Sequence, residues 1–174
     1  MKKLYLILVC SIFSLLTFAG NTVKVVEGEK GIKEAFASKV VASLEIDWSD
    51  AQYDHSKSMK EYWGDKYDYF VKECEDNFKK GFDEKASGLC LGKKGEPQYK
   101  LLIKVDNLDR YVNVMNIVPG FTVKFWGTII IYTSEGKEIG KIEVDSMKGN
   151  RDFNIEDAFG KAFYILGKRV AQMK

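Results

Sequence analysis

The sequence predicts an α+β domain in which a largely antiparallel sheet of about six strands carries two amphipathic helices on one face. Two segments, at 58–82 and 154–170, repeat apolar residues every three or four positions, as helices with one buried face do. Between them, residues 99–145 alternate apolar and polar side chains in successive runs separated by short turns. This pattern predicts an antiparallel meander.

The first nineteen residues have the form of a secretory signal peptide. Lys2 and Lys3 precede an apolar run that ends at Phe18, and the small residue Ala19 favours cleavage before Gly20. The run is shorter than the roughly 17–25 residues that a membrane-spanning helix needs. We therefore expect an exported protein of a bacterial envelope, periplasmic, outer-membrane-associated or secreted, with no transmembrane segment in the mature chain. The alternative is an uncleaved anchor.

The mature chain, residues 20–174, is expected to form a single domain, because no repeat or proline-rich linker divides it. Its first strand is predicted at 22–27, closed by Gly28 and Gly31. The second is predicted at 39–48, where alternate residues share one apolar face. The residues of that face are Ala42, Leu44, Ile46 and Trp48.

The first predicted helix begins at Ser58, which forms a capping box with Glu61. Its apolar stripe runs from Met59 to Phe82, and Gly81 is a candidate for the helix end. Residues 87–98 contain three glycines and a proline and are expected to form a loop.

The meander is predicted from three alternating runs. Residues 99–105 form the first, and 111–118 lead into Pro119-Gly120, the pair that a type II turn prefers. Residues 121–131 are the strongest strand, and 134–137 turn the chain back into 138–145. The second long helix follows, with Asn154 as its N-cap.

Charge argues against a nucleic-acid partner. Loss of Lys2 and Lys3 lowers Lys+Arg from 27 to 25, equal to the 25 acidic residues, so the mature chain has almost no net charge. Its arginines are Arg110, Arg151 and Arg169. A nucleic-acid binder needs a basic face and usually uses arginine for forked contacts. The expected partner is instead an envelope component or a small ligand.

Cys74 and Cys90 are the cysteines of the mature chain. An even number of cysteines in an exported protein favours a disulfide, which would stabilise the fold by roughly 3 kcal/mol. The alternative is two separate buried thiols. No C-x-x-C spacing indicates a redox role.

One polar cluster could carry chemistry. Asp47, Asp50, Asp54 and His55 follow a predicted strand within nine residues. Carboxylates and imidazole are metal ligands, and they also serve in hydrolases. However, the cluster matches no calcium loop, and the chain has no G-x-S-x-G nucleophile motif. The cluster fits a polar loop leading into a helix equally well. No metal, cofactor or catalytic residue is predicted.

Aromatic residues favour a binding surface. Tyr62 and Tyr69 lie near the flank of the first helix's apolar stripe, and Trp126 lies on the polar side of its strand. Exposed aromatic side chains bind sugars, peptides and partner proteins. The alternative is that these rings pack as core.

The order of the elements resembles that of small exported proteins of Bacteroidetes-type bacteria and of uncharacterised envelope lipoproteins with a strand–helix–meander–helix layout. The resemblance rests on D-W-S-D-A-Q-Y-D at 47–54, the long aromatic helix, Y-K-L-L-I-K-V-D at 99–106 and I-Y-T-S-E-G-K-E-I at 131–139. It implies an α/β sandwich at the envelope without established enzymatic activity. The chain departs from it by lacking a lipoprotein cysteine after the apolar run, since Cys10 lies inside that run. No functional residue follows from it.

Two functions are therefore compatible with the sequence. The first is a non-catalytic binding or interaction module that presents its sheet face or the Tyr62–Phe70 helix surface to a partner. The alternative is a hydrolase or metal-dependent enzyme built on Asp47, Asp50, Asp54 and His55. An enzyme would gather those side chains into one pocket, whereas a binding module would leave them dispersed.

Overall fold

The fold is an α+β sandwich of two layers, as the sequence predicts. The computed structural model describes residues 22–111 and 120–173. The strands are β1 (Thr22–Glu27), β2 (Ala42–Asp47), β3 (Gln52–Tyr53), β4 (Lys57–Ser58), β5 (Tyr99–Tyr111), β6 (Thr122–Thr133) and β7 (Glu138–Lys148). The helices are α2 (Glu29–Ala37), α3 (Met59–Trp63), α4 (Tyr67–Lys85) and α5 (Ile155–Ala171), with a short 3-10 helix, η1 (Gly64–Lys66). The predicted signal peptide and most of the segment from 111 to the Pro119-Gly120 turn lie outside the described residues.

The sheet is mostly antiparallel, in the order β1-β7-β6-β5-β3-β4, and β2 also pairs with β5. The predicted meander is confirmed as β5-β6-β7. Its second turn lies where the sequence places it, and the Thr133 amide donates to the Lys137 carbonyl across that turn at 2.9 Å. β2 and β3 pair with β5 in parallel. Parallel strands need a long crossover, and α4 provides it between β2 and β5.

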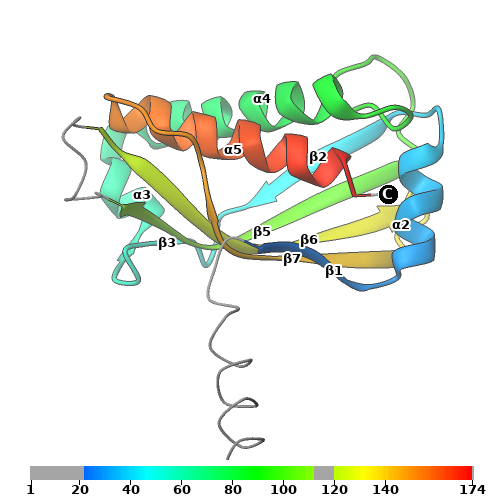
Figure 1. Ribbon diagram of the computed structural model, residues 1–174, viewed down its shortest axis with the longest axis horizontal. Coiled ribbons are helices and arrows are strands. Elements are labelled where there is room, and N and C mark those ends of the chain that lie inside the picture. The colour runs from blue at the N-terminus through cyan, green and yellow to red at the C-terminus, as the bar shows by residue number, and fades with distance from the viewer. Residues whose placement is uncertain (1–21, 112–119, 174) are drawn as a thin grey trace, which may run out of the picture.

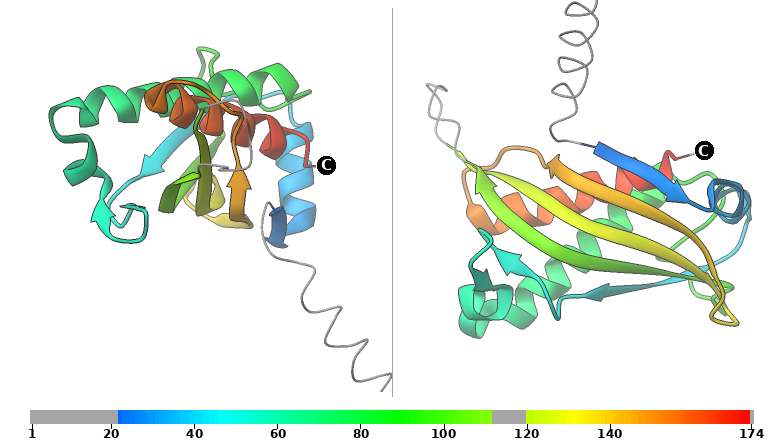
Figure 2. Two further views of the ribbon diagram at one scale, coloured as in Figure 1. Left: turned by 60° about the vertical axis from the view of Figure 1, so that its left-hand side comes forward. Right: turned by 90° about the horizontal axis from the view of Figure 1, so that it is seen from below.

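Helices α4 and α5 lie side by side on one face of the sheet, while the opposite face carries no helix of the described chain (Figure 1; Figure 2, right). The core fills the space between the helix layer and the sheet. Its largest fully buried side chains come from both layers, among them Phe78 and Phe82 of α4, Phe159 and Phe163 of α5, and Phe125 of β6.

Glycines bring α4 and α5 close together. A Cβ atom on Gly81 would lie 2.0 Å from the Tyr164 carbonyl oxygen, and one on Gly167 would lie 2.3 Å from the Phe78 carbonyl oxygen. Gly81 therefore does not end the helix, as its sequence position suggests. The helix continues to Lys85, and Gly81 is needed for the close approach of the two backbones.

The long predicted helix is divided. Ser58 caps α3 as predicted, because its hydroxyl accepts a hydrogen bond from the Glu61 amide at 3.1 Å. Gly64 then adopts φ 52° and ψ −127°, a conformation outside the helical region, and η1 follows before α4 begins. The apolar stripe continues through this break, which is why periodicity alone predicts one helix.

Helix α2 was not predicted. Gly28 precedes it in a left-handed conformation with φ 68°, and a Cβ on Gly28 would lie 2.1 Å from the Ile139 carbonyl oxygen. Gly28 ends β1 after Glu27, as predicted, and both Gly28 and Gly31 are in addition close-approach positions against β7. Ile32, Ala35 and Phe36 bury one face of this nine-residue helix.

The predicted disulfide is wrong: Cys74 and Cys90 are free thiols. Cys74 is fully buried within α4. From there the helix continues to Lys85, so it carries the chain about 16 Å along its axis away from Cys74. Cys90 then joins the edge of β2, where its amide donates to the Val40 carbonyl at 3.0 Å. Burial raises the pKa of the Cys74 thiol well above its usual value.

Candidate functional site

The uncovered face of the sheet carries the polar and aromatic residues of the central strands. Along β6, Val123, Phe125 and Ile129 are fully buried against the helices. Because successive strand residues point to opposite faces, Lys124 and Trp126 lie on the uncovered face. The sequence prediction that Trp126 lies on the polar side of its strand is thus confirmed, and its side chain is half-buried.

Both strands beside Trp126 contain a bulge at its position. On β5, Asp106 is the extra residue, and Asn107 pairs with Trp126. On β7, Asp145 and Ser146 together stand opposite Trp126. Bulges re-aim the side chains that follow them and occur often beside functional sites. Here the β5 bulge keeps Leu108 in the core and places Asp109 next to Lys124 on the uncovered face.

Two lysines meet one tyrosine ring beside Trp126. The Lys124 ammonium lies 4.8 Å from the centre of the Tyr111 ring and 6.0 Å from that of Trp126. The Lys148 ammonium lies 5.0 Å from the Tyr111 ring centre. The Tyr111 side chain is 37% exposed, so this cation–π arrangement is open to solvent.

A histidine from the β3–β4 turn completes the group. The His55 ring packs edge-on to Trp126 with ring centres 5.5 Å apart. Its Nε2 lies 3.5 Å from a carboxylate oxygen of Asp109 and 3.2 Å from the amide nitrogen of Asn107. Asn107 is 97% buried, accepts from the His55 backbone amide at 2.9 Å and donates to Asp109 at 2.5 Å.

We name these seven residues the Trp126 cluster: His55, Asn107, Asp109, Tyr111, Lys124, Trp126 and Lys148. Backbone strain gathers around it. Among the described residues, the non-glycine positions with positive φ are Asp54, His55 and Ser146, at 53°, 52° and 44°. Asp54 and His55 form the turn that holds the imidazole, and Ser146 belongs to the bulge opposite Trp126. Strained backbone of this kind persists where surrounding structure fixes it, commonly at functional sites.

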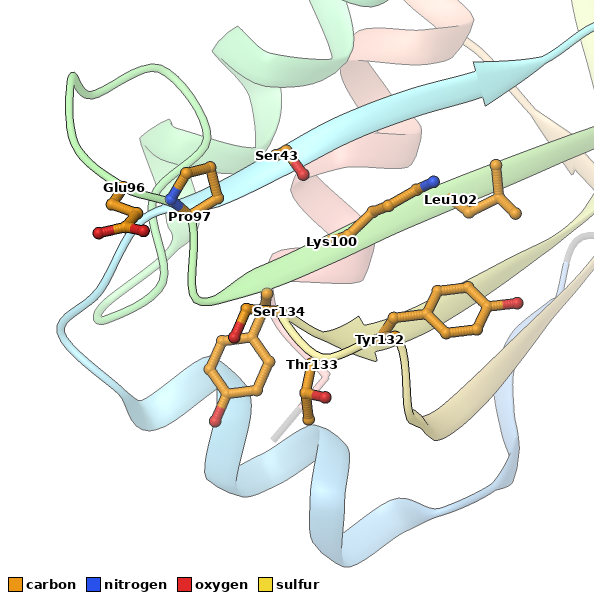
Figure 3. Close-up of a pocket in the computed structure, with 10 residues that line it drawn as sticks. Ser43, Glu96, Pro97, Lys100, Leu102, Tyr132, Thr133 and Ser134 are labelled. Atoms are coloured by element: carbon orange, nitrogen blue, oxygen red, sulfur yellow. The ribbon is translucent and has the colours of Figure 1, made fainter.

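A shallow pocket of about 580 Å³ lies at the other end of the uncovered face. Figure 3 shows Lys100 and Leu102 of β5 beside Tyr132 of β6, with Glu96 and Pro97 of the preceding loop at the rim. Its size is within the range of ligand pockets. However, the Lys100 ammonium is already paired with Glu45 at 2.5 Å, so the positive charge of this pocket is neutralised.

The predicted polar cluster is not gathered into one site. Asp47 turns to Ser49, whose hydroxyl donates at 2.7 Å and lowers the pKa of the Asp47 carboxyl. Asp50 and Asp54 are exposed. Partial burial raises the pKa of Asp106, and the nearby charge of Asp50 adds to that effect. No group of three or more histidine, cysteine or acidic side chains among the described residues could hold a metal ion.

The two predicted tyrosines differ. The Tyr62 ring stacks on Tyr53 with centres 3.7 Å apart, so one of its faces is occupied. Burial, with the hydrogen bond that the Tyr53 hydroxyl makes to Tyr62, raises the pKa of the Tyr53 phenol. Tyr69 is 62% exposed on α4. It is separate from the Trp126 cluster, because α4 lies on the opposite side of the sheet (Figure 1).

Sequence reasoning found Trp126 and His55 but did not connect them, and it missed Asn107, Asp109 and Lys148. The regular alternation that predicts β5 ends at Val105, just before the bulge. Lys124 and Tyr111 carried a usable signal, since both belong to predicted strands. Their meeting depends on the pairing register between strands, which alternation within one strand does not encode.

Among the described residues, no helix is long and apolar enough to cross a bilayer. Comparison with protein-family models and with curated proteins gives no match.

Solved structures give distant similarities. The chain is similar to PelC from Paraburkholderia phytofirmans, solved as a dodecamer in two crystal forms. The two comparisons give 11% and 12% identity, TM-scores of 0.40 and 0.39, 86% of this chain covered, and 95% and 96% of PelC covered. It is also similar to a DUF330 protein from Xanthomonas campestris, with 10% identity and a TM-score of 0.40, covering 88% of this chain and 91% of that protein. These similarities are too distant to carry a functional argument.

Proposed function

We propose that this chain is an exported, non-catalytic binding module of the bacterial cell envelope and that the Trp126 cluster is its binding surface. The proposal is based on one observation: two aromatic side chains, two lysines and a histidine contact one another on the face of the sheet that the helices leave uncovered. Aromatic rings with polar groups at their edges are typical of recognition surfaces. The two bulges and the buried Asn107 amide hold this group in place.

Two features distinguish the Trp126 cluster from other surfaces of the molecule. Six of its seven residues lie on β5, β6 and β7, in the central part of the sheet. In the pocket beside Tyr132, the Lys100 ammonium is already paired with Glu45, and Tyr69 is a single exposed ring on a helix. A binding module needs several groups that act on one ligand, and the Trp126 cluster supplies them.

Retention on isolated envelope material tests the binding role. The mature protein is passed over immobilised envelope fractions of the bacterium that makes it, beside the Trp126→Ala and Tyr111→Ala variants and the control Tyr69→Ala. We expect wild-type protein and Tyr69→Ala to be retained and both cluster variants to be lost, with circular dichroism showing that all four are folded. Equal retention of all four proteins would contradict the proposed surface.

Export has its own test. The signal-peptide pattern predicts that protein recovered from the envelope begins at Gly20. Intact mass spectrometry measures this directly. A mass that still includes residues 1–19, or that includes an acyl chain, would contradict release from the membrane and would indicate a membrane-anchored protein.

A further inference from the structure

The register of the sheet places two lysines opposite one another in the Trp126 cluster. Lys124 of β6 pairs with Lys148 of β7 on one side and with Asp109 of β5 on the other. Like charges directly opposite one another on neighbouring strands are unfavourable. The nearest carboxylate in register, that of Asp109, would be expected to compensate Lys124.

Asp109 does not compensate Lys124. Its carboxylate is held by the Asn107 amide at 2.5 Å and faces the His55 ring at 3.5 Å. Within the described part of the chain, Lys124 forms no ion pair with any carboxylate, and its ammonium is turned over the Tyr111 ring instead. Lys124 therefore presents an ammonium without a direct ion pair among the described residues beside two aromatic rings, which is complementary to a ligand that carries an anion.

The aromatic rings indicate that the ligand has an apolar face as well as an anionic group. Tyr111 and Trp126 offer apolar faces within reach of the same Lys124 ammonium, at 4.8 and 6.0 Å from their centres. A ligand that uses the whole group needs an apolar face to stack on a ring and an anionic substituent at its edge. A pyranose with a carboxylate meets both needs, and its hydroxyls can hydrogen-bond to the His55 imidazole, which is 64% exposed.

Other anionic partners fit less well. Nucleic acid is disfavoured by the near-zero net charge of the mature chain and its few arginines. Recognition of an anionic membrane typically uses roughly four to eight clustered basic residues, and the Trp126 cluster has two lysines. Extended peptides usually add to a sheet edge, whereas Trp126 lies on a central strand.

We infer that the Trp126 cluster binds an acidic saccharide, with a sugar ring stacked on Trp126 or Tyr111 and its carboxylate between Lys124 and Lys148. This inference rests on the proposed function and names the ligand class of that same surface. Binding is expected to weaken as salt rises, because exposed charges are screened over about 8 Å at physiological ionic strength.

The test is calorimetric titration of the mature protein with tri-galacturonate and with its neutral methyl ester, which keeps the sugar rings and removes the charge. We expect the ester, and the Lys124→Gln variant with tri-galacturonate, each to bind about tenfold more weakly or worse. Lys104→Gln is the matched control, since it removes the same charge from the neighbouring strand β5, on the same face of the sheet but outside the Trp126 cluster. It should bind within about twofold of wild type.

Each outcome decides the inference. Equal affinity for the acid and the ester, or an equal loss in Lys104→Gln, would overturn the anion-specific site. Lys124-dependent binding to phosphatidylglycerol vesicles, with no binding of tri-galacturonate, would reassign the surface to lipid headgroups. If neither saccharide binds while retention on envelope material still depends on Trp126, the acidic saccharide is not the ligand, but the proposed binding module stands. If retention on envelope material does not depend on Trp126, both the acidic saccharide and the proposed binding surface are wrong.

Discussion

At the scale of single residues, Asn107 matters both for the stability of the fold and for the geometry of the Trp126 cluster. It is the buried polar residue of the described core, at 3% exposure, and its side-chain amide joins the β3–β4 turn to β5. A buried amide is tolerated because its hydrogen bonds are made, and here they reach the His55 backbone and the Asp109 carboxylate. Asn107 therefore positions two residues of the Trp126 cluster without itself being exposed to a ligand.

Asn107→Ala should lower the free energy of unfolding by about 1–3 kcal/mol and also weaken saccharide binding, because the His55 turn loses its anchor. Asn154→Ala is the control. It removes the N-cap bond to the Glu156 amide, which should cost about 1 kcal/mol, and it leaves the Trp126 cluster intact. Urea denaturation and titration with tri-galacturonate measure the two effects. Equal binding by both variants would show that Asn107 acts on stability alone.

The two thiols of the described residues give a second residue-scale prediction. Cys74 is fully buried and its thiol pKa is raised, whereas Cys90 is half-buried beside a surface pocket. A thiol reagent should therefore label Cys90 in the folded protein and both thiols after denaturation. Non-reducing and reducing mass spectra should agree. A non-reduced mass two daltons below the reduced mass would show that Cys74 and Cys90 form a disulfide and would contradict the structure.

At the scale of elements, the α4–α5 pair depends on glycines whose Cβ atoms would strike backbone. Gly167→Ala should destabilise the protein by about 1–3 kcal/mol, because the new methyl meets the Phe78 carbonyl oxygen at 2.3 Å and the helices must separate. Gly160→Ala, in the same helix, is the matched control. Its methyl would meet the Asn77 side-chain amide at 2.9 Å, which can rotate away, and alanine favours the helix by about 1 kcal/mol.

Chemical denaturation of both variants measures this difference. We expect Gly160→Ala to remain within about 1 kcal/mol of wild type. Similar losses in the two variants would mean that helix spacing does not set the stability of this layer.

A charged contact also links the two helices. The Tyr164 hydroxyl donates to Glu84 and Lys168 pairs with it, and together they lower the Glu84 pKa from 4.5 to about 2. A carboxyl with a depressed pKa stabilises the fold above its unfolded pKa and loses that contribution as pH falls through the folded value. The window is therefore pH 4.5 to about 2.

Glu84→Gln should lower Tm at neutral pH and show a smaller fall in Tm than wild type across that acidic window. Tyr164→Phe removes the largest cause of the shift and should give an intermediate slope. Thermal melts in a series of buffers measure both. Parallel Tm curves for wild type and Glu84→Gln would contradict a role for this carboxylate in acid stability.

The elements also show where sequence patterns suffice. Alternation in 39–48 and 121–131 predicts β2 and β6, and the caps at Ser58 and Asn154 are confirmed by their hydrogen bonds. Sequence patterns give a wrong prediction where the same residue type can serve two structural roles. Gly31 within α2 and Gly81 within α4 resemble breakers but serve close packing, which depends on β7 and α5, elements distant in sequence.

At the scale of the whole molecule, the layer architecture follows from the sequence and the candidate site does not. Two apolar helix stripes and an alternating meander already predict helices on one face and an uncovered sheet face opposite. The Trp126 cluster requires the strand order and two bulges, which bring His55 and Asn107 together across 52 positions of sequence. Register between strands is a property of the assembled sheet.

The central claim is that ligand binds on the uncovered face at the Trp126 cluster. Amide chemical-shift mapping of the labelled mature protein during titration with tri-galacturonate tests it most directly. The account predicts shifts concentrated at Asp109, Tyr111, Lys124, Trp126 and the His55 turn, with α4 and α5 unchanged. Shifts centred on the Lys100–Tyr132 pocket or on the helix layer would contradict it.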